Sequence, residues 1–352
     1  MKIAINGFGR IGRAFFRQAI KEPDIEIVAI NDLADFQNLV YLLKHDTVYG
    51  PFDQPIKVQT NLQVSQQINA RGILSVNNQD IWFFQEKDPL NLPWKALNID
   101  AVIEATGVFD DYEKAKSHLQ AGAKKVIITA PAKGEEEGIK GRTILLGINE
   151  EENKNFEIIS NGSCTTNAIS PVLEILNEKI GIQKAILNTT HAYTATQALV
   201  DSPCSKDWLR GKAGAQNLVP STTGAAQTIA KVIKTLENKF DGLAIRVPVI
   251  CGSLADITFV SAKPTTKEEI NELLTQASQE ERWKNILAVS LEPLASSDII
   301  KTTIPAIVDA TFTKVVDNDL VKILVWYDNE WAYATTLIYQ ILKIKQELAD
   351  KN

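Results

Sequence analysis

Short apolar runs alternate with amphipathic stretches through the first part of the chain. Residues 2–6 form a short apolar run, and residues 10–22 carry apolar side chains on one side until Pro23 stops the pattern. Further apolar runs lie at residues 25–31, 101–105 and 125–129, with a helical pattern near residues 112–121. Apolar strands separated by helices predict a parallel sheet that is covered on both faces.

The later part of the chain has longer runs in which apolar and polar residues alternate. Such alternation predicts an antiparallel sheet with one covered face. The clearest helix start is Thr266, whose hydroxyl can cap the helix while Glu269 reaches back to the Thr266 backbone. The predicted strands are residues 184–190, 243–249, 255–262, 306–313 and 320–327.

The change of pattern predicts two domains and a boundary near residues 161–164. We expect an α/β Rossmann dinucleotide-binding domain over residues 1–163, completed by a C-terminal helix over residues 329–352. Residues 55–84 add short antiparallel strands with turns at 69–72 and 77–78. An α+β catalytic domain with a mostly antiparallel sheet is expected over residues 164–328.

Composition and charge narrow the possible partners. The 352 residues are 45% hydrophobic and 23% charged, which is typical of a globular protein that needs no disulfide staples. The net charge of −6 argues against nucleic acid or an anionic membrane as the main partner. No apolar run is long enough to span a bilayer, and no signal-peptide pattern precedes the first strand, so we expect a cytoplasmic protein.

A glycine motif follows the first strand. Gly7, Gly9 and Gly12 form a GxGxxG pattern, and Asp32 ends the next predicted strand twenty positions after Gly12. In this setting the glycines permit a tight turn, close approach to a pyrophosphate, and close packing of helix on strand. An acidic residue at position 32 favours NAD over NADP, because it would repel a 2′-phosphate. The alternative is a plain glycine turn with a solvated aspartate.

One cysteine lies where a nucleophile is expected. Cys164 follows a predicted strand at residues 157–160 and begins a predicted helix that Pro171 should distort. A helix N-terminus lowers the pKa of a thiol, and the polar neighbours of Cys164 argue against an apolar pocket. The alternative is a buried small hydrophobic residue, which is how we interpret Cys204 and Cys251. Three widely spaced cysteines predict neither a disulfide framework nor a metal site.

A reactive cysteine needs a base, and the chain has three histidines. His191 ends the predicted strand at residues 184–190 and opens into a polar loop, whereas His45 and His118 are predicted to be solvated. No two of the three histidines have a metal-ligand spacing, so no metal is expected. Together these features predict an NAD-dependent dehydrogenase with Cys164 as its nucleophile and His191 as the base.

The chain also resembles phosphorylating glyceraldehyde-3-phosphate dehydrogenase along almost its whole length. The order and spacing of many segments carry this resemblance. They include INGFGRIGR (5–13), LLKHDTVYG (42–50), EATGVF (104–109), GAKKVIITAPAK (122–133), SNGSCTTN (160–167), HAYT (191–194), STTGAA (221–226), RVPV (246–249), EPLASSDII (292–300) and WYDNEWAY (326–333).

The resemblance implies oxidation of D-glyceraldehyde 3-phosphate to 1,3-bisphosphoglycerate through a hemithioacetal and a thioester, in glycolysis or gluconeogenesis. Cys164 matches the family nucleophile and His191 its activating partner. Thr194 and Arg246 match the site for the substrate's phosphate, and Arg210 matches a further anion-binding arginine. The site for the attacking inorganic phosphate is matched by Ser163, Thr165, Thr223 and Gly224.

The resemblance also implies how the cofactor and neighbouring subunits are bound. Residues 193–216 match a loop that packs against a neighbouring subunit's cofactor site, which implies a homotetramer. Lys87, Thr196 and Ser202 depart from the usual arginine, aspartate and leucine. Besides the three glycines, the positions matching NAD contacts are Arg10, Ile11, Asp32, Lys87, Thr106, Thr129 and Asn329.

Two other functions are compatible with parts of the sequence. Erythrose-4-phosphate dehydrogenase shares the cofactor site and the cysteine, but that family usually lacks the residues matched here by Thr194, Thr223 and Gly224. A non-catalytic, RNA-binding Rossmann protein is disfavoured by the acidic charge balance and the lack of a basic stripe. A moonlighting role of that kind leaves no mark in the sequence.

Overall fold

The computed structural model describes residues 1–60, 69–134, 141–205 and 207–349. The chain forms two compact units. Unit 1 comprises Met1–Ile144, Glu150–Gly162 and Ala334–Asn352, and unit 2 comprises Leu145–Asn149 and Ser163–Tyr333. No helix within the described ranges has the length and apolarity needed to cross a membrane.

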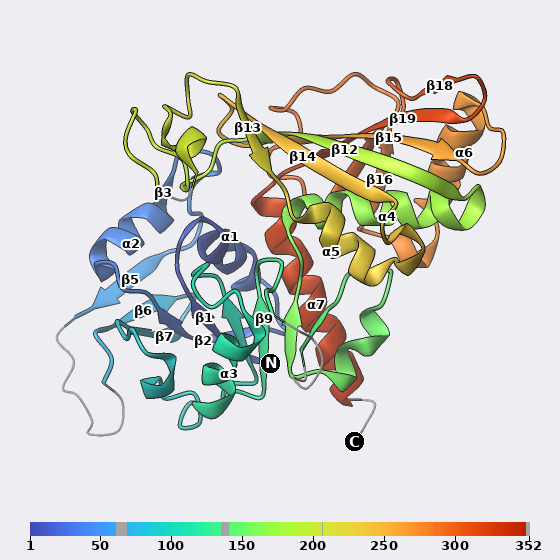
Figure 1. The fold of residues 1–352 in the computed structure, drawn as a ribbon. Coiled ribbons are helices and arrows are strands. Elements are labelled where there is room, and N and C mark those ends of the chain that lie inside the picture. The colour runs from blue at the N-terminus through green and yellow to red at the C-terminus, as the bar shows by residue number, and fades with distance from the viewer. Residues whose placement is uncertain (61–68, 135–140, 206, 350–352) are drawn as a thin grey trace. The chain divides into compact units, whose positions relative to one another are not determined.

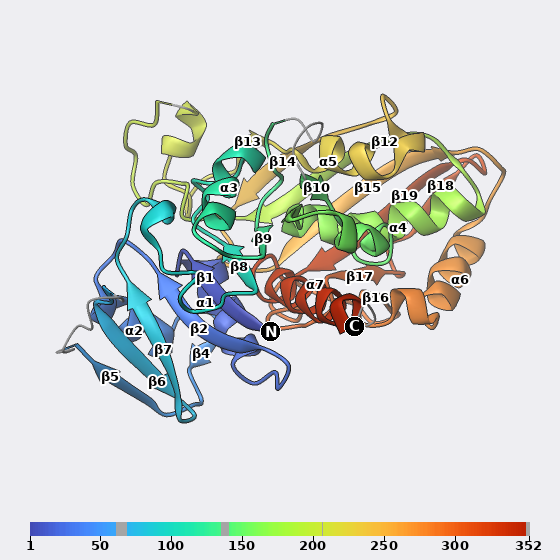
Figure 2. The ribbon, with the colours of Figure 1, turned by 90° about the horizontal axis from the view of Figure 1, so that it is seen from below.

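Unit 1 is built on a nine-stranded sheet with the order β10-β11-β9-β8-β1-β2-β7-β6-β5. The strands from β10 to β7 pair in parallel, whereas β6 and β5 add an antiparallel edge (Figure 2). The strands are β1 (Lys2–Asn6), β2 (Glu26–Asn31), β5 (Ile56–Gln59), β6 (Gly72–Val76), β7 (Gln79–Phe84), β8 (Ala101–Glu104), β9 (Lys125–Ile128), β10 (Gly141–Thr143) and β11 (Ile158–Ser160). A separate two-stranded ribbon pairs β3 (His45–Asp46) with β4 (Gly50–Pro51).

Helices cover both faces of this sheet. The connections β1–α1–β2 and β8–α3–β9 run in opposite directions along the sheet, so right-handed crossovers place α1 and α3 on opposite faces. Thr335 of α7 donates to Gln18 of α1 at 2.7 Å, which fastens the C-terminal helix to unit 1 (red in Figure 1). The helices are α1 (Arg10–Ala19), α2 (Phe36–Lys44), α3 (Tyr112–Gln120) and α7 (Trp331–Ala349), and the 3₁₀ turns are Pro89–Asn91 and Glu150–Asn155.

The predicted turn at residues 77–78 is confirmed. Asn77 and Asn78 have φ values of 52° and 64°, which join β6 to β7 in a two-residue hairpin. Asparagine tolerates this left-handed conformation better than most residues.

Unit 2 is built on an eight-stranded mixed sheet with the order β13-β14-β12-β15-β19-β17-β16, in which β18 also pairs with β19. Only the β12–β14 and β16–β17 pairs are parallel, so the expected mostly antiparallel sheet is confirmed. The strands are β12 (Ile182–Ala192), β13 (Val219–Thr222), β14 (Phe240–Val247), β15 (Ser253–Ser261), β16 (Leu287–Ser290), β17 (Ala306–Asp309), β18 (Lys314–Val316) and β19 (Leu320–Tyr327).

Helices α4 (Cys164–Lys179), α5 (Ala225–Val232) and α6 (Lys267–Ala277) pack on one face of this sheet (Figure 1). Buried residues of β15 and β19 alternate with less buried ones, as the sequence pattern predicts. Leu173, Ile257 and Ile323 lie in the resulting core and are fully buried. Three 3₁₀ turns complete the unit at Trp208–Gly211, Lys234–Leu236 and Glu281–Trp283.

Three local predictions need correction. The predicted strand at residues 306–313 forms only over Ala306–Asp309 (β17), because the Asp309 carboxylate accepts from the backbone N–H and hydroxyl of Thr311 and turns the chain. Only half of the capping box forms: Thr266 caps Glu269 at 3.2 Å, but the Glu269 carboxylate accepts from the Thr265 hydroxyl. Helix α4 continues across Pro171 without a break.

Candidate active site

Cys164 is the first residue of α4. Ser163 caps this helix by accepting from the Thr166 backbone N–H at 3.1 Å. The Cys164 side chain is half-buried and packs against the hydrophobic core of unit 2. The argument from polar neighbours against an apolar pocket therefore needs correction, because the side chain of Cys164 packs partly against apolar residues that are distant in the sequence.

His191 lies beside Cys164. Its Nε2 atom is 3.5 Å from the Cys164 Sγ atom, and the imidazole is 5% exposed. Its Nδ1 atom lies 2.7 Å from the Ala192 carbonyl oxygen and 2.5 Å from Nη1 of Arg246. If Nδ1 donates to the carbonyl, Nε2 can accept the thiol proton; if it accepts from Arg246, Nε2–H can donate to sulfur. Both roles are needed during covalent catalysis.

The sheet register brings Arg246 to His191. Strands β12 and β14 pair in parallel, with His191 directly opposite Arg246. The guanidinium also donates to the Ala192 carbonyl at 3.0 Å. Across the part of the chain that the structure describes, no carboxylate lies within ion-pair distance of Arg246. A half-buried cation without a counter-ion favours an anionic ligand.

Burial is the main cause of the pKa shifts of His191 and Cys164. Burial, reinforced by Arg246, lowers the pKa of His191 to about 3, so the imidazole is neutral near pH 7. Burial raises the pKa of Cys164, although Arg246 and hydrogen bonds from Thr165 oppose that shift. The predicted lowering of the thiol pKa is wrong for this structure, because desolvation of Cys164 outweighs the opposing charge of Arg246 and the hydrogen bonds from Thr165.

Other residues predicted to bind anions lie in unit 2 with partners of their own. Arg210 forms an ion pair with Asp207 at 3.2 Å and donates to Ser221 at 3.0 Å. Burial, with a contribution from the positive charge of Arg210, lowers the pKa of Arg246, so the two guanidinium groups repel each other electrostatically. Thr194 shares a 2.9 Å hydrogen bond with Thr196, the residue that departs from the family pattern.

The hydroxyl groups matched to the inorganic phosphate site also serve local structure. Ser163 caps α4, and Thr223 accepts from the Ala225 N–H at 3.2 Å where α5 begins after Gly224. Thr165 shares a 2.9 Å hydrogen bond with the hydroxyl of Tyr327. A hydroxyl that accepts one of these bonds still has its own proton to donate.

Sequence reasoning missed Tyr327, which lies in the segment WYDNEWAY (326–333) and received no role of its own. The Tyr327 hydroxyl lies 2.9 Å from Thr165 and 2.7 Å from Thr189, and its ring meets the His191 ring edge to face at 6.0 Å. Burial raises the pKa of Tyr327, so its hydroxyl stays protonated. The alternation along β19 places Tyr327 on the buried side of the strand, and this pattern was the sequence signal that could have drawn attention to it.

Gly7 and Gly9 of the glycine motif line a pocket of about 440 Å³ within unit 1. Gly7 has a φ of 95°, and a Cβ there would lie 2.6 Å from the Ala105 carbonyl carbon. A Cβ on Gly9 would meet nothing within 4 Å, so this side of the turn is open to a ligand. A Cβ on Gly12 would lie 2.1 Å from the Gly7 carbonyl oxygen. The turn therefore fits a dinucleotide phosphate at the start of α1.

Not every residue matched to NAD lines this pocket. Gly7, Gly9, Asp32, Lys87 and Thr106 do. The Asp32 carboxylate accepts from the Phe8 N–H at 2.6 Å and the Ala34 N–H at 2.9 Å, which ties the second strand end to the glycine turn. The pocket lining does not include Arg10, Ile11, Gly12 and Thr129.

Two of the remaining matched residues have defined partners. Arg10 forms an ion pair with Asp46 at 2.5 Å in unit 1. In unit 2, Asn329 is buried and its Oδ1 accepts from Gly252 N–H at 3.1 Å and the Ser253 hydroxyl at 2.9 Å. These bonds orient the Asn329 amide so that its NH₂ group points elsewhere and can donate to a ligand.

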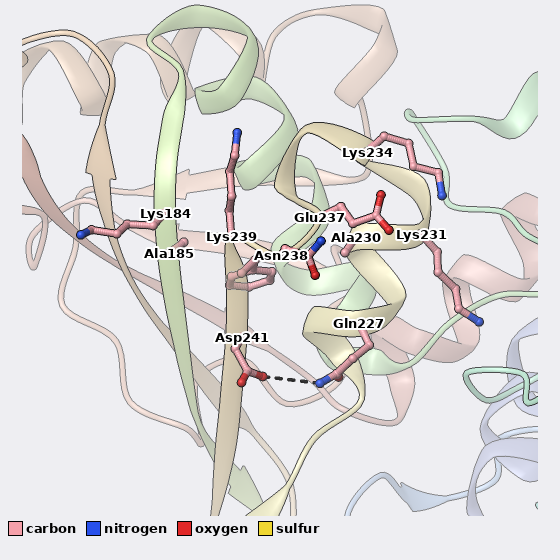
Figure 3. Close-up of a pocket in the computed structure, with 11 residues that line it drawn as sticks. Lys184, Ala185, Gln227, Ala230, Lys231, Lys234, Glu237, Asn238, Lys239 and Asp241 are labelled. Carbon is pink, nitrogen blue, oxygen red and sulfur yellow. Dashed lines mark hydrogen bonds between the residues drawn. The ribbon is translucent and has the colours of Figure 1, made fainter.

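A second hollow, of about 600 Å³, lies in unit 2 (Figure 3). Its lining includes Lys184, Lys231, Lys234 and Lys239, whose ammonium groups point in different directions. The lining contains no cysteine, histidine or arginine. It therefore offers solvated cations rather than a reactive centre.

Comparison with known proteins decides the family. Family models for glyceraldehyde 3-phosphate dehydrogenase match residues 1–112 (NAD binding domain) and residues 163–329 (C-terminal domain). The chain belongs to the glyceraldehyde-3-phosphate dehydrogenase family. It is 47% identical over 340 residues to the enzyme of that name from Thermotoga maritima, covering 96% of this chain and 97% of the relative. The corresponding enzyme from Geobacillus stearothermophilus is 43% identical over 340 residues, covering 96% of each chain.

Within this dehydrogenase family the cofactor is NAD, as the glycine motif predicted.

The structure contradicts the prediction for one histidine. His118 was predicted to be solvated, but it is fully buried and hydrogen-bonded in unit 1. Its position on the inner side of α3 places it against the sheet, and the short polar helix gave no warning of this.

Proposed function

We propose that the chain catalyses the NAD-dependent, phosphorylating oxidation of D-glyceraldehyde 3-phosphate to 1,3-bisphosphoglycerate. The observation that carries this proposal is the 3.5 Å contact between Cys164 Sγ and His191 Nε2, with the unpaired cation of Arg246 directly behind the imidazole. A nucleophile, a base and a fixed cation suit an aldehyde that also bears a phosphate.

The chemistry assigned to unit 2 runs in two halves. Cys164 attacks the aldehyde carbon while His191 removes the thiol proton, and the resulting hemithioacetal oxygen is stabilised by His191 and the Cys164 backbone N–H. When bound, NAD would supply the acceptor for the hydride from the hemithioacetal carbon. His191 takes the proton of the hemithioacetal hydroxyl, so that a thioester remains on Cys164. Inorganic phosphate then attacks the thioester carbon, Cys164 leaves as the thiolate, and the acyl phosphate is released.

The remaining matched residues receive proposed binding roles. Thr194 and Arg246 would hold the phosphate of the aldehyde, and Arg210 adds positive charge near Arg246. The attacking phosphate would be held by Ser163, Thr165, Thr223 and Gly224. NAD would be held by Gly7, Gly9, Arg10, Ile11, Gly12, Asp32, Lys87, Thr106, Thr129 and Asn329.

This assignment makes residues 1–163 with the helix 329–352 the NAD-binding domain and residues 164–328 the catalytic domain. The pocket around the glycine turn and the reactive pair around Cys164 support it, since each lies within one of the two structural units.

The deciding experiment measures NADH formation from glyceraldehyde 3-phosphate with and without inorganic phosphate. We expect sustained turnover only when phosphate is present, and loss of at least about a thousandfold in kcat for Cys164→Ser with NAD binding retained. Equal steady-state rates without phosphate would show hydrolysis of the thioester instead. Full activity of Cys164→Ser would remove the nucleophile from the proposal.

We further propose a cytoplasmic homotetramer. Several large apolar side chains in and just beyond the loop at residues 193–216 are exposed, among them Leu199 at 82%, Trp208 at 86% and Leu218 at 71%. Exposed apolar side chains gathered in one loop favour contact with another subunit. Light scattering should give four times the chain mass, and Trp208→Glu should reduce that mass. A monomer in solution would contradict this proposal.

A further inference from the structure

A row of buried polar side chains crosses the sheet of unit 1 beside the glycine turn. Asn31, Asn6 and Glu104 end the adjacent parallel strands β2, β1 and β8, and they are in register. Asn31 Nδ2 donates to Asn6 Oδ1 at 2.7 Å, and Asn6 Nδ2 donates to Glu104 Oε2 at 2.6 Å. All three are at most 4% exposed. Residues this polar are seldom buried at adjacent strand ends without a reason.

His118 completes the row from helix α3. Its Nε2 atom lies 3.0 Å from Glu104 Oε2, and its Nδ1 atom lies 3.1 Å from the indole nitrogen of Trp94. An indole N–H can only donate, so Nδ1 accepts and Nε2 carries the proton that is donated to Glu104. The ring is fully buried, and Trp94 thus sets which nitrogen faces the carboxylate.

The other oxygen of Glu104 reaches the pocket wall. Glu104 Oε1 accepts from the Thr106 N–H at 2.9 Å and from the Thr106 hydroxyl. Thr106 lines the dinucleotide pocket, and its hydroxyl in turn accepts from the Val108 N–H at 3.0 Å. The Ala105–Thr106 peptide is also the group that a side chain at Gly7 would strike. The buried carboxylate of Glu104 therefore orients Thr106 in the pocket wall, next to the peptide that lies close to Gly7 in the glycine turn.

We infer that His118 is a positioning residue for NAD, acting through Glu104 on Thr106 and Asn6. This inference rests on the proposed function, because it takes the pocket around Gly7 to be the NAD site. A buried carboxylate rotates toward whatever donors it has. Without the His118 donor, Glu104 loses one of its fixed partners and Thr106 loses its fixed orientation.

Calorimetric NAD titration of His118→Phe tests the inference. Phenylalanine retains the ring volume but removes the donor to Glu104. We expect the NAD dissociation constant and the KM for NAD to rise about tenfold, the size expected for a lost hydrogen bond to a charged group. The KM for the aldehyde and kcat at saturating NAD should change less than about twofold, because unit 2 is untouched. Lys114→Ala, an exposed change on the same helix, is the matched control.

If the phenylalanine variant folds poorly, His118→Gln remains as a test, because it retains a donor and should keep much of the NAD affinity. Where His118→Phe folds, its effect on NAD affinity should not add to that of Thr106→Val, because both changes act on one hydrogen-bonded unit. Additive effects, or unchanged NAD affinity in folded His118→Phe, would overturn the inference while leaving the proposed function intact. Failure of the unaltered chain to bind NAD would overturn the proposed function first.

Discussion

Arg246 and His191 face each other across neighbouring strands with 2.5 Å between Nη1 and Nδ1. A guanidinium can only donate hydrogen bonds, so this contact favours the imidazole with its proton on Nε2, facing the sulfur. An anion that draws Arg246 away would favour the other tautomer, in which Nδ1 carries the proton and donates it to the Ala192 carbonyl, 2.7 Å distant, while Nε2 is able to accept the thiol proton. Arg246, which would bind the substrate's phosphate, therefore also influences which ring nitrogen of His191 carries the proton.

Arg246→Leu should weaken binding of the phosphorylated aldehyde. The change removes the fixed charge and the planar donors, so we expect the KM for glyceraldehyde 3-phosphate to rise at least about tenfold. The KM of Arg246→Lys should lie between those of the unaltered protein and Arg246→Leu, because lysine retains the charge but not the planar, two-pronged set of donors. Steady-state kinetics measures this, with the exposed Arg71→Leu as control. An unchanged KM in Arg246→Leu would place the substrate's phosphate elsewhere.

His191→Asn should slow alkylation of Cys164. Burial raises the pKa of this thiol, so without the imidazole the sulfur should stay protonated at neutral pH. We expect the rate with iodoacetamide near pH 7 to fall at least about tenfold and its pH profile to move to higher pH. Mass spectrometry of the Cys164 peptide follows the reaction, and Cys204 provides an internal control. Equal rates in the two proteins would show that His191 does not activate the thiol.

His191 should also make the folded protein sensitive to acid. Its pKa is about 3 in the fold against an ordinary value of 6.5, so between these pH values only the unfolded chain binds the proton. Stability is therefore lost as pH falls below 6.5, by about 1.4 kcal/mol per pH unit from this group. The thermal midpoint of His191→Asn should fall less steeply between about pH 6.5 and pH 4.5 than that of the unaltered protein. Parallel pH profiles would show that His191 takes up its proton in the folded state.

Asp32→Ala should relax the choice of cofactor. The carboxylate lines the pocket and would repel a 2′-phosphate, so its removal should raise the NADP-to-NAD ratio of kcat/KM at least about tenfold. NAD use should also weaken, because the Phe8 N–H loses its acceptor. Asp35→Asn keeps the cap of α2 and is the nearby control. A ratio that stays at its original value would mean that selectivity against NADP comes from other residues.

Much of this protein could be predicted from local sequence. Strand and helix periodicity, the Asn77–Asn78 turn and the backbone demands of Gly7, Gly9 and Gly12 involve neighbours within a few residues. The placement of Cys164 at a strand-to-helix junction is equally local. These features determine the fold class and point to the reactive residues.

The tertiary structure alone decided how those residues behave. Nothing in the local sequence indicated that β12 and β14 would pair His191 with Arg246. The alternation along β19 pointed Tyr327 inward but did not indicate that its hydroxyl would reach Thr165 and Thr189. The same holds for the desolvation that raises the pKa of Cys164 and for the burial of His118. Strand register and burial arise from contacts between segments far apart in the chain, and the pKa shifts follow from them.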